Sequence, residues 1–138
     1  MKRQIKFRGK DEFGNWCYGH LVDYDDDGME IQGYDIYQDG NEEWKSRAVD
    51  PDTVGQFTGL YDSVGNEIYE GDILRFGNSP SGICEAKWNE SIAAFCIRFS
   101  FENKLGCRPL GNWVKCERSI EIIGNIHDNP ELLKGGEE

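Results

Sequence analysis

The run Asp23–Gly28 comes closest, in residue type and spacing, to a metal site in this sequence. Asp23, Asp25 and Asp27 match positions 1, 3 and 5 of a Ca²⁺-binding EF-hand loop, and Gly28 matches position 6. Position 12, which must supply a bidentate carboxylate, is Tyr34, and no helix is predicted on either side. The sequence therefore predicts a solvated hairpin turn, with a weak Ca²⁺ site as the alternative.

Cysteine and histidine offer a second candidate chemistry, because Cys17 and His20 have the C-x-x-H spacing of zinc ligands. Zinc needs four ligands, and the remaining thiols are scattered without a second pair: Cys84, Cys96, Cys107 and Cys116. The other histidine, His127, is expected to lead into a C-terminal turn. The odd number of cysteines and their scattered positions predict reduced thiols.

No serine–histidine–acid order and no phosphate-binding glycine pattern stands out in the sequence. We therefore expect no cofactor and no enzymatic activity.

A partner surface is the remaining candidate. The acidic residues Asp25, Asp26 and Asp27 are followed along the chain by the aromatic residues Tyr34, Tyr37 and Trp44. Aromatic rings beside carboxylates suit recognition of a basic peptide. The alternative is that these rings anchor a polar hairpin to the core.

Charge is distributed unevenly along the 138 residues, whose formal net charge is −11. Residues 1–10 carry five Lys or Arg and no acid, whereas residues 11–52 carry thirteen acids against two bases. A generic nucleic-acid binder should have a basic surface, so we expect no direct binding of nucleic acid. No apolar run of about 18 residues occurs, so no membrane span is expected, and without a signal peptide the chain is expected in the cytoplasm.

Period-two alternation dominates the sequence and predicts short strands separated by turns. The clearest pair runs from Cys84 to Trp88 and from Ile92 to Phe101, joined by a link of hairpin length that begins at Asn89. Further strands are expected at 5–8, 16–22, 29–36, 54–60, 73–76 and 120–122, and in a segment that ends at Val114.

The fold class that follows is mainly β, a small barrel-like or sandwich-like domain of short antiparallel strands. Asn129-Pro130-Glu131 is typical of a helix start, so a short C-terminal helical turn is expected. A weak boundary lies near Asp50–Asp52. We find no internal repeat and no linker, and we therefore predict one domain over residues 1–138, with a more variable acidic segment at about 23–50.

Three blocks in order make the sequence resemble the YopX family of phage and prophage proteins. The first is IKFRGKD at 5–11. The second is TVGQFTGLYD at 53–62 with GNEIYEGDIL at 65–74, and the third is IIGNIHDNPELL at 122–133. The resemblance implies a small, mainly β protein of phage or prophage origin. It supplies no catalytic residue, because the matched positions are turn and core types.

From the residues and the resemblance together we expect an accessory protein that binds a host or phage macromolecule and performs no chemistry. Two alternatives stay open. One is an acidic mimic that blocks a nucleic-acid-binding host protein, and the other is a β-barrel that binds a small ligand or a metal. Self-association through exposed strand edges is also open.

Overall fold

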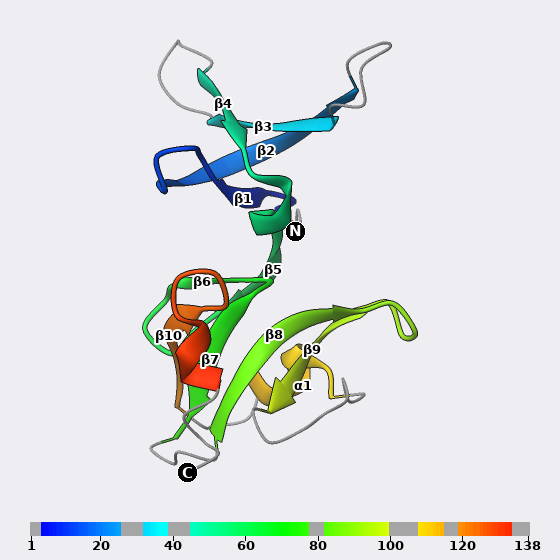
Figure 1. Cartoon of the computed structure of the whole chain (residues 1–138). Helices are drawn as coiled ribbons and strands as arrows, with labels where there is room; N and C mark the ends of the chain where they lie inside the picture. The colour runs from blue at the N-terminus through cyan, green and yellow to red at the C-terminus, as the bar shows by residue number, and fades with distance from the viewer. Residues whose placement is uncertain are drawn as a thin grey trace. The chain divides into compact units, whose positions relative to one another are not determined.

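The computed structural model describes residues 4–25, 32–38, 45–77, 82–99, 108–114 and 119–133 (Figure 1). The chain forms two compact units, Met1–Phe57 and Thr58–Glu138. The change of unit falls a few residues after the weak boundary expected near Asp50–Asp52. The prediction of one domain stays a prediction, since two compact units can belong to one domain.

The first unit is an antiparallel sheet in the order β4-β3-β2-β1-β5. Its elements are β1 (Phe7–Lys10), β2 (Trp16–Asp25), β3 (Gln32–Gln38), β4 (Lys45–Val49), the 3-10 turn η1 (Pro51–Thr53) and the start of β5 (Gly55–Tyr61). Phe7 pairs with Gln56 and Arg8 with Gly55, so the first residues of β5 extend this sheet beside β1.

The end of β4 meets β1 because Gly9 has no side chain. A Cβ placed on Gly9 would lie 2.8 Å from Cγ2 of Val49. The close approach is held by the N–H of Asp50, which donates to the carbonyl oxygen of Lys10 at 2.8 Å. The hydroxyl of Thr53 accepts from the N–H of Lys10, also at 2.8 Å. Val49 and Cys17 form the buried centre of this unit, with Phe7, Leu21 and Val54 packed against them.

The second unit contains a four-stranded antiparallel sheet in the order β10-β7-β8-β9 (Figure 1). Its elements are β6 (Glu67–Tyr69), β7 (Asp72–Phe76), β8 (Ile83–Asn89), β9 (Ala94–Phe99), α1 (Leu110–Val114), β10 (Ile120–Asn125) and the 3-10 turn η3 (Pro130–Leu133). Strand order places β6 beside β5. None of the sheets closes into a barrel within the described residues.

The main core lies on one face of this four-stranded sheet. Strand register puts Leu74 opposite Cys84, and Ala86 opposite Ile97, on that face. Leu110 of the short helix α1 is fully buried against it. The buried members of the core are Ile68, Leu74, Phe76, Cys84, Ala86, Ile97, Leu110 and Ile120. Cys84 and Cys96 are buried with free thiols, so each packs as a small apolar residue.

Most of the predicted elements are confirmed, and two are wrong. The hairpin predicted from Cys84–Trp88 and Ile92–Phe101 is present as β8–β9, with the last two residues of the prediction outside the described part of the chain. The late strand from Ile120 and the C-terminal turn are present as β10 and η3. The acidic turn was expected to begin at Asp23, but β2 continues to Asp25 because its pairing with β3 continues to Gln32. Val114 ends the short helix α1 and not a strand. Leu110 of this helix is buried in the core, and five residues are too few to show helical periodicity in the sequence. No helix in the described part of the chain is long and apolar enough to cross a membrane.

Candidate functional site

The best-defined polar site is the turn between β1 and β2, Asp11-Glu12-Phe13-Gly14-Asn15. The N–H of Gly14 donates to the carbonyl of Asp11 at 3.1 Å, and the N–H of Asp11 donates to the carbonyl of Asn15 at 3.0 Å. Gly14 has a φ of 82°, which an L side chain rarely adopts. The Oδ1 atom of Asp11 accepts from the N–H groups of both Phe13 and Asn15 at 2.9 Å. One carboxylate oxygen therefore satisfies two backbone donors of the turn.

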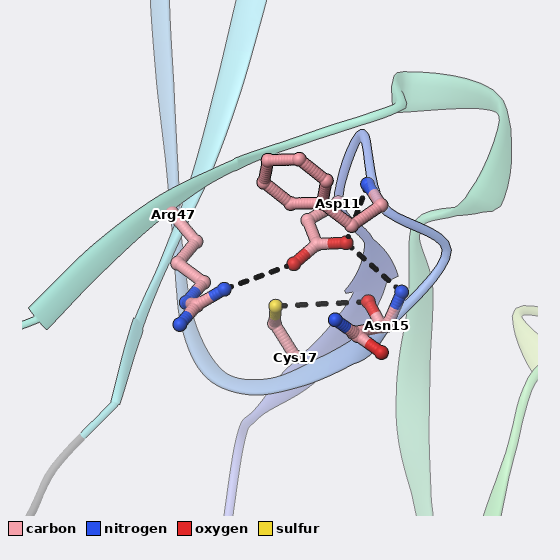
Figure 2. Close-up of polar contacts among 5 residues, drawn as sticks. Asp11, Asn15, Cys17 and Arg47 are labelled. Carbon is pink, nitrogen blue, oxygen red and sulfur yellow. Dashed lines mark hydrogen bonds and ion pairs between the residues drawn. The ribbon is translucent and has the colours of Figure 1, made fainter.

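The second oxygen of Asp11 ties the turn to β4. Its Oδ2 atom accepts from Nη1 of Arg47 at 3.0 Å (Figure 2). The Asp11 side chain is 4% exposed and that of Arg47 52% exposed. The carboxylate is thus shielded on the protein side while the arginine bridges to it from the surface.

These contacts decide what Asp11 can do chemically. Hydrogen bonding from the backbone N–H of Asn15 is the main cause that lowers the pKa of Asp11, and Phe13 and Arg47 lower it further, against the effect of burial. A general base must accept a proton near neutral pH, so a carboxylate with a lowered pKa and three donors is unsuited to that role. Asp11 positions the turn.

Cys17 lies next to this cluster and is 2% exposed. Its Sγ atom contacts the carbonyl oxygen of Asn15 at 3.8 Å (Figure 2). Burial is the main cause that raises the pKa of the Cys17 thiol, the charge of Asp11 raises it further, and Arg47 opposes both. A buried thiol with a raised pKa is a poor nucleophile, because the thiolate is the reactive form.

The same turn occurs a second time, between β5 and β6, as Asp62-Ser63-Val64-Gly65-Asn66. Oδ1 of Asp62 accepts from the N–H of Val64 at 3.1 Å and from that of Asn66 at 2.8 Å. Gly65 has a φ of 93°, and its N–H donates to the carbonyl of Asp62 at 3.1 Å. Burial opposes ionisation of Asp62, but hydrogen bonds from Asn66, Ile122 and Val64 together lower its pKa. We call Asp11–Asn15 and Asp62–Asn66 the paired turns.

The paired turns expose an apolar side chain at the same position. Phe13 is 75% exposed and Val64 79% exposed, while the backbone N–H of each donates to the aspartate of its own turn. Each side chain is therefore carried outward on a backbone that hydrogen bonds hold in place. An exposed aromatic residue on a fixed backbone is the type of group that anchors protein interfaces.

A further exposed apolar group lies at the end of the β8–β9 hairpin, which Figure 1 shows extending away from α1. Trp88 packs edge-on against Phe95 with the ring centroids 5.0 Å apart, and Ile92 is exposed beside the turn. Ala93 in this turn has a φ of 52°, which is unfavourable for a residue with a Cβ.

The structure does not bring the predicted Ca²⁺ ligands into a loop. Asp23 and Asp25 lie in β2, opposite Tyr34 and Gln32 of β3, and Asp27 is outside the described residues. Cys17 is buried and His20, three residues along the same strand, is exposed, so the two belong to opposite faces. Among the residues that the structure describes, no group of three Asp, Glu, His or Cys could hold a metal ion.

The predicted partner surface is only partly described. Tyr34 and Tyr37 are residues of β3, with Tyr37 opposite His20. Asp26 and Trp44, like Asp27, lie outside the described residues. Asp25 is the last residue of β2.

His127 has the place expected for it, in the turn before η3. The side-chain oxygen of Asn125 accepts from the N–H of His127 at 3.0 Å and from that of Asp128 at 2.9 Å. The N–H of Ile126 donates to the carbonyl of Gly71 at 2.9 Å, which fastens this turn to the start of β7.

The paired turns were missed from the sequence, although the signal was present. Both have the pattern Asp-x-x-Gly-Asn between alternating segments, and a five-residue repeat this short was not recognised as one. The pattern predicts this turn because the aspartate side chain can accept from backbone N–H groups two and four residues later, and glycine in the fourth position tolerates the positive φ.

Comparison with known proteins adds family and fold. A family model described as "YopX protein" matches residues 6–134 of the chain. The crystal structure of protein EF1440 from Enterococcus faecalis is similar at a TM-score of 0.54 and 24% sequence identity, covering 96% of this chain and 99% of that one. No curated protein sequence matches the chain.

Proposed function

Since the chain belongs to the YopX family, we propose that it is a non-enzymatic interaction module of phage or prophage origin that binds a host or phage protein in the bacterial cytoplasm. Family membership leaves the biochemical role open. The binding role is supported by an exposed aromatic side chain, and the absence of chemistry by reactive groups that are buried or hydrogen-bonded within the fold.

The observation that carries the proposal is the presentation of Phe13. Phe13 is 75% exposed, and its backbone N–H donates to Oδ1 of Asp11. Because the backbone is held, mainly the side-chain rotamer has to be ordered on binding, so more of the contact energy is available to the complex. Truncation of such an anchor in other interfaces typically costs more than about 2 kcal/mol.

The absence of chemistry is supported by how the reactive groups are used. Asp11 and Asp62 each accept several hydrogen bonds, and their pKa values are lowered. The Cys17 thiol is buried and its pKa is raised. Each of these groups is committed to the fold. A reproducible turnover in a broad screen for hydrolase activity would overturn this part of the proposal.

The paired turns supply a matched test. Purified protein is immobilised and incubated with nuclease-treated lysate of the bacterial host, in parallel with Phe13→Ala and Val64→Ala. We expect one enriched protein that is lost with Phe13→Ala, which removes the aromatic anchor, and kept with Val64→Ala. The two variants are matched, because each removes a similarly exposed side chain from the same position of the turn. Enrichment that survives Phe13→Ala, or is lost equally with both variants, would contradict the role of Phe13.

The acidic segment is tested in the same experiment by changing Asp25, Asp26 and Asp27 together to Asn. Loss of the enriched protein in this variant alone would move the contact surface from Phe13 to the acidic segment. We do not favour an acidic mimic of nucleic acid. Strand register places Asp25 opposite Gln32 and Asp35 opposite Val22, so positions 25 and 35 are out of phase and belong to different faces of the sheet.

A further inference from the structure

The second paired turn, Asp62–Asn66, covers the edge of a sheet. The strand β10 is the edge strand of the four-stranded sheet, with β7 on its paired side (Figure 1). On its other side, the N–H of Ile120 donates to Oγ of Ser63 at 2.7 Å, and the N–H of Ser63 donates to the carbonyl of Ile120 at 2.9 Å. The N–H of Ile122 donates to Oδ2 of Asp62 at 3.5 Å, a longer and weaker bond. The turn therefore takes the place of a neighbouring strand.

The covered groups are those that an edge strand leaves open. In an antiparallel sheet, alternate residues direct both N–H and C=O to the same neighbour. The carbonyl of Ser119 accepts from the N–H of Gly77, just after β7, at 2.8 Å, so Ile120 and Ile122 direct their groups outward. Open groups of this kind are a template for another strand. The turn satisfies them mainly with a hydroxyl and a carboxylate, which do not extend the sheet to a further strand.

The paired turns differ in the target of these side chains. In the first paired turn, Oδ2 of Asp11 accepts from the side chain of Arg47 at 3.0 Å. Glu12 has the place of Ser63 and is exposed. The two turns share a backbone conformation, but Asp62 and Ser63 are directed at the backbone of a strand. Covering β10 is therefore a property of these two side chains and not of the turn type.

We propose that Asp62 and Ser63 form a guard that keeps β10 from pairing with β10 of a second copy of the chain. The guard makes three hydrogen bonds in each chain. A two-fold pair of β10 strands with Ile120 opposite Ile122 would supply about two per chain. The turn is also tethered, which gives it an effective concentration on the order of millimolar. A second copy at micromolar concentration therefore loses the competition.

A second copy is the occupant that suits the edge once the guard is removed. In the two-fold pair, Ile120 and Ile122 of both copies share one face, and Ile120 is 3% exposed on the core side, so the apolar face continues across the pair. Glu121 of one copy would face Glu121 of the other, but each is paired with Arg75 of its own chain at 2.9 Å. Phe13 has no part in the guard, so this proposal and the proposed binding role fail separately.

The test is the mass of the protein in solution, measured by sedimentation equilibrium. We expect the unchanged protein to be a monomer at about 100 micromolar, about tenfold below the effective concentration of the guard. The double variant Asp62→Ala, Ser63→Ala should dimerise over the same range, because its β10 edge is open. The matched control is Asp11→Ala, Glu12→Ala, which removes the corresponding side chains from the first paired turn. It should stay a monomer.

Two measurements locate the association at β10. Hydrogen exchange followed by NMR, on protein dilute enough to be monomeric, reports on the N–H of Ile120. Ser63→Ala should make this group exchange about fivefold faster or more, the usual net contribution of one hydrogen bond. A labelled peptide with the sequence of residues 119–125 should bind the double variant and not the unchanged protein, because only the variant has an open edge.

Three results would overturn the proposal. The first is a double variant that keeps the circular dichroism spectrum and the mass of the unchanged protein. The second is equal dimerisation of the Asp11→Ala, Glu12→Ala control, which would attribute association to a loosened turn. The third is unchanged exchange of the Ile120 N–H in Ser63→Ala. If the double variant does not fold, Ser63→Ala decides the matter alone, since it keeps every hydrogen bond of Asp62 within the turn.

Discussion

Replacing Gly9 by Ala tests the approach of β4 to β1 most directly. The new Cβ would lie 2.8 Å from Cγ2 and 2.9 Å from Cβ of Val49, closer than such atoms pack, and the Val49 side chain is buried. Overpacking of this kind costs about 1–3 kcal/mol of unfolding free energy. The loss of unfolded-state entropy on replacing Gly recovers about 0.4–1 kcal/mol. We therefore expect a net loss of about 1–2 kcal/mol.

The diagnostic result is the double variant. Val49→Ala alone removes two methyl groups from the core of the first unit, at about 0.8 kcal/mol each plus a cavity contribution, or about 2 kcal/mol. In Gly9→Ala, Val49→Ala the contact with Cγ2 of Val49 is relieved, but Cβ of residue 49 stays 2.9 Å from the new Cβ. The double variant should therefore lose about 1 kcal/mol less than the sum of the two single losses, which is a coupling of about 1 kcal/mol.

Urea unfolding followed by circular dichroism gives each free energy, provided that the slope with denaturant is the same for all variants. Gly14→Ala is the matched control. Its φ of 82° makes an added Cβ unfavourable, but no atom lies within 4 Å of it, so its cost should simply add to that of Val49→Ala. If the Gly9 and Val49 effects are additive within about 0.5 kcal/mol, the two residues do not meet and the described closure of β4 on β1 is wrong.

Three further predictions concern the turns, the metal alternative and the second sheet. The folded-state pKa values of Asp11 and Asp62 are lowered, so both carboxylates stabilise the fold above about pH 4, and this effect is lost as pH falls through their folded pKa values. Asp11→Asn and Asp62→Asn should therefore flatten the fall of melting temperature below about pH 4, and curves parallel to that of the unchanged protein would refute this. Millimolar Ca²⁺ should leave the melting temperature unchanged, because Asp23 and Asp25 lie in a strand and not in a loop. Millimolar Zn²⁺ should also leave it unchanged, because Cys17 and His20 lie on opposite faces of β2. A rise of several degrees with either ion would restore the metal hypothesis. Gly124→Ala should destabilise the protein by about 1–3 kcal/mol in urea, since its Cβ would lie 2.6 Å from Oδ1 of Asn129, and Asn129→Ala should relieve much of that cost; the absence of relief would show that the clash lies elsewhere.

The strand content was predictable because alternation records which side of a strand is buried. Phe95, Ile97 and Phe99 alternate with Cys96 and Arg98, and this pattern located β9 closely. The turn at Gly71-Asp72 was also predictable in chemical detail. Gly71 has a φ of 93°, and Oδ2 of Asp72 accepts from the N–H of Tyr69 at 2.7 Å.

Other features depend on long-range contacts that alternation does not encode. The extension of β2 to Asp25 depends on its pairing with β3, and the helix α1 depends on burial of Leu110 against the core of the second sheet. The ion pair of Asp11 with Arg47 joins residues that are 36 positions apart. The contact of Lys10 with the Trp16 ring needs the register of β1 against β2 before the two residues can be placed together.

In the paired turns, the residues that set the loop conformation are different from the residues whose side chains are exposed. At Phe13 and Val64 the fold uses only the backbone N–H, while the conformation is set by the aspartate, glycine and asparagine around them. Any residue except proline supplies that N–H. Sequence drift at these two positions is therefore almost free of a folding penalty. Single codon changes can therefore alter what these loops display while the scaffold stays intact.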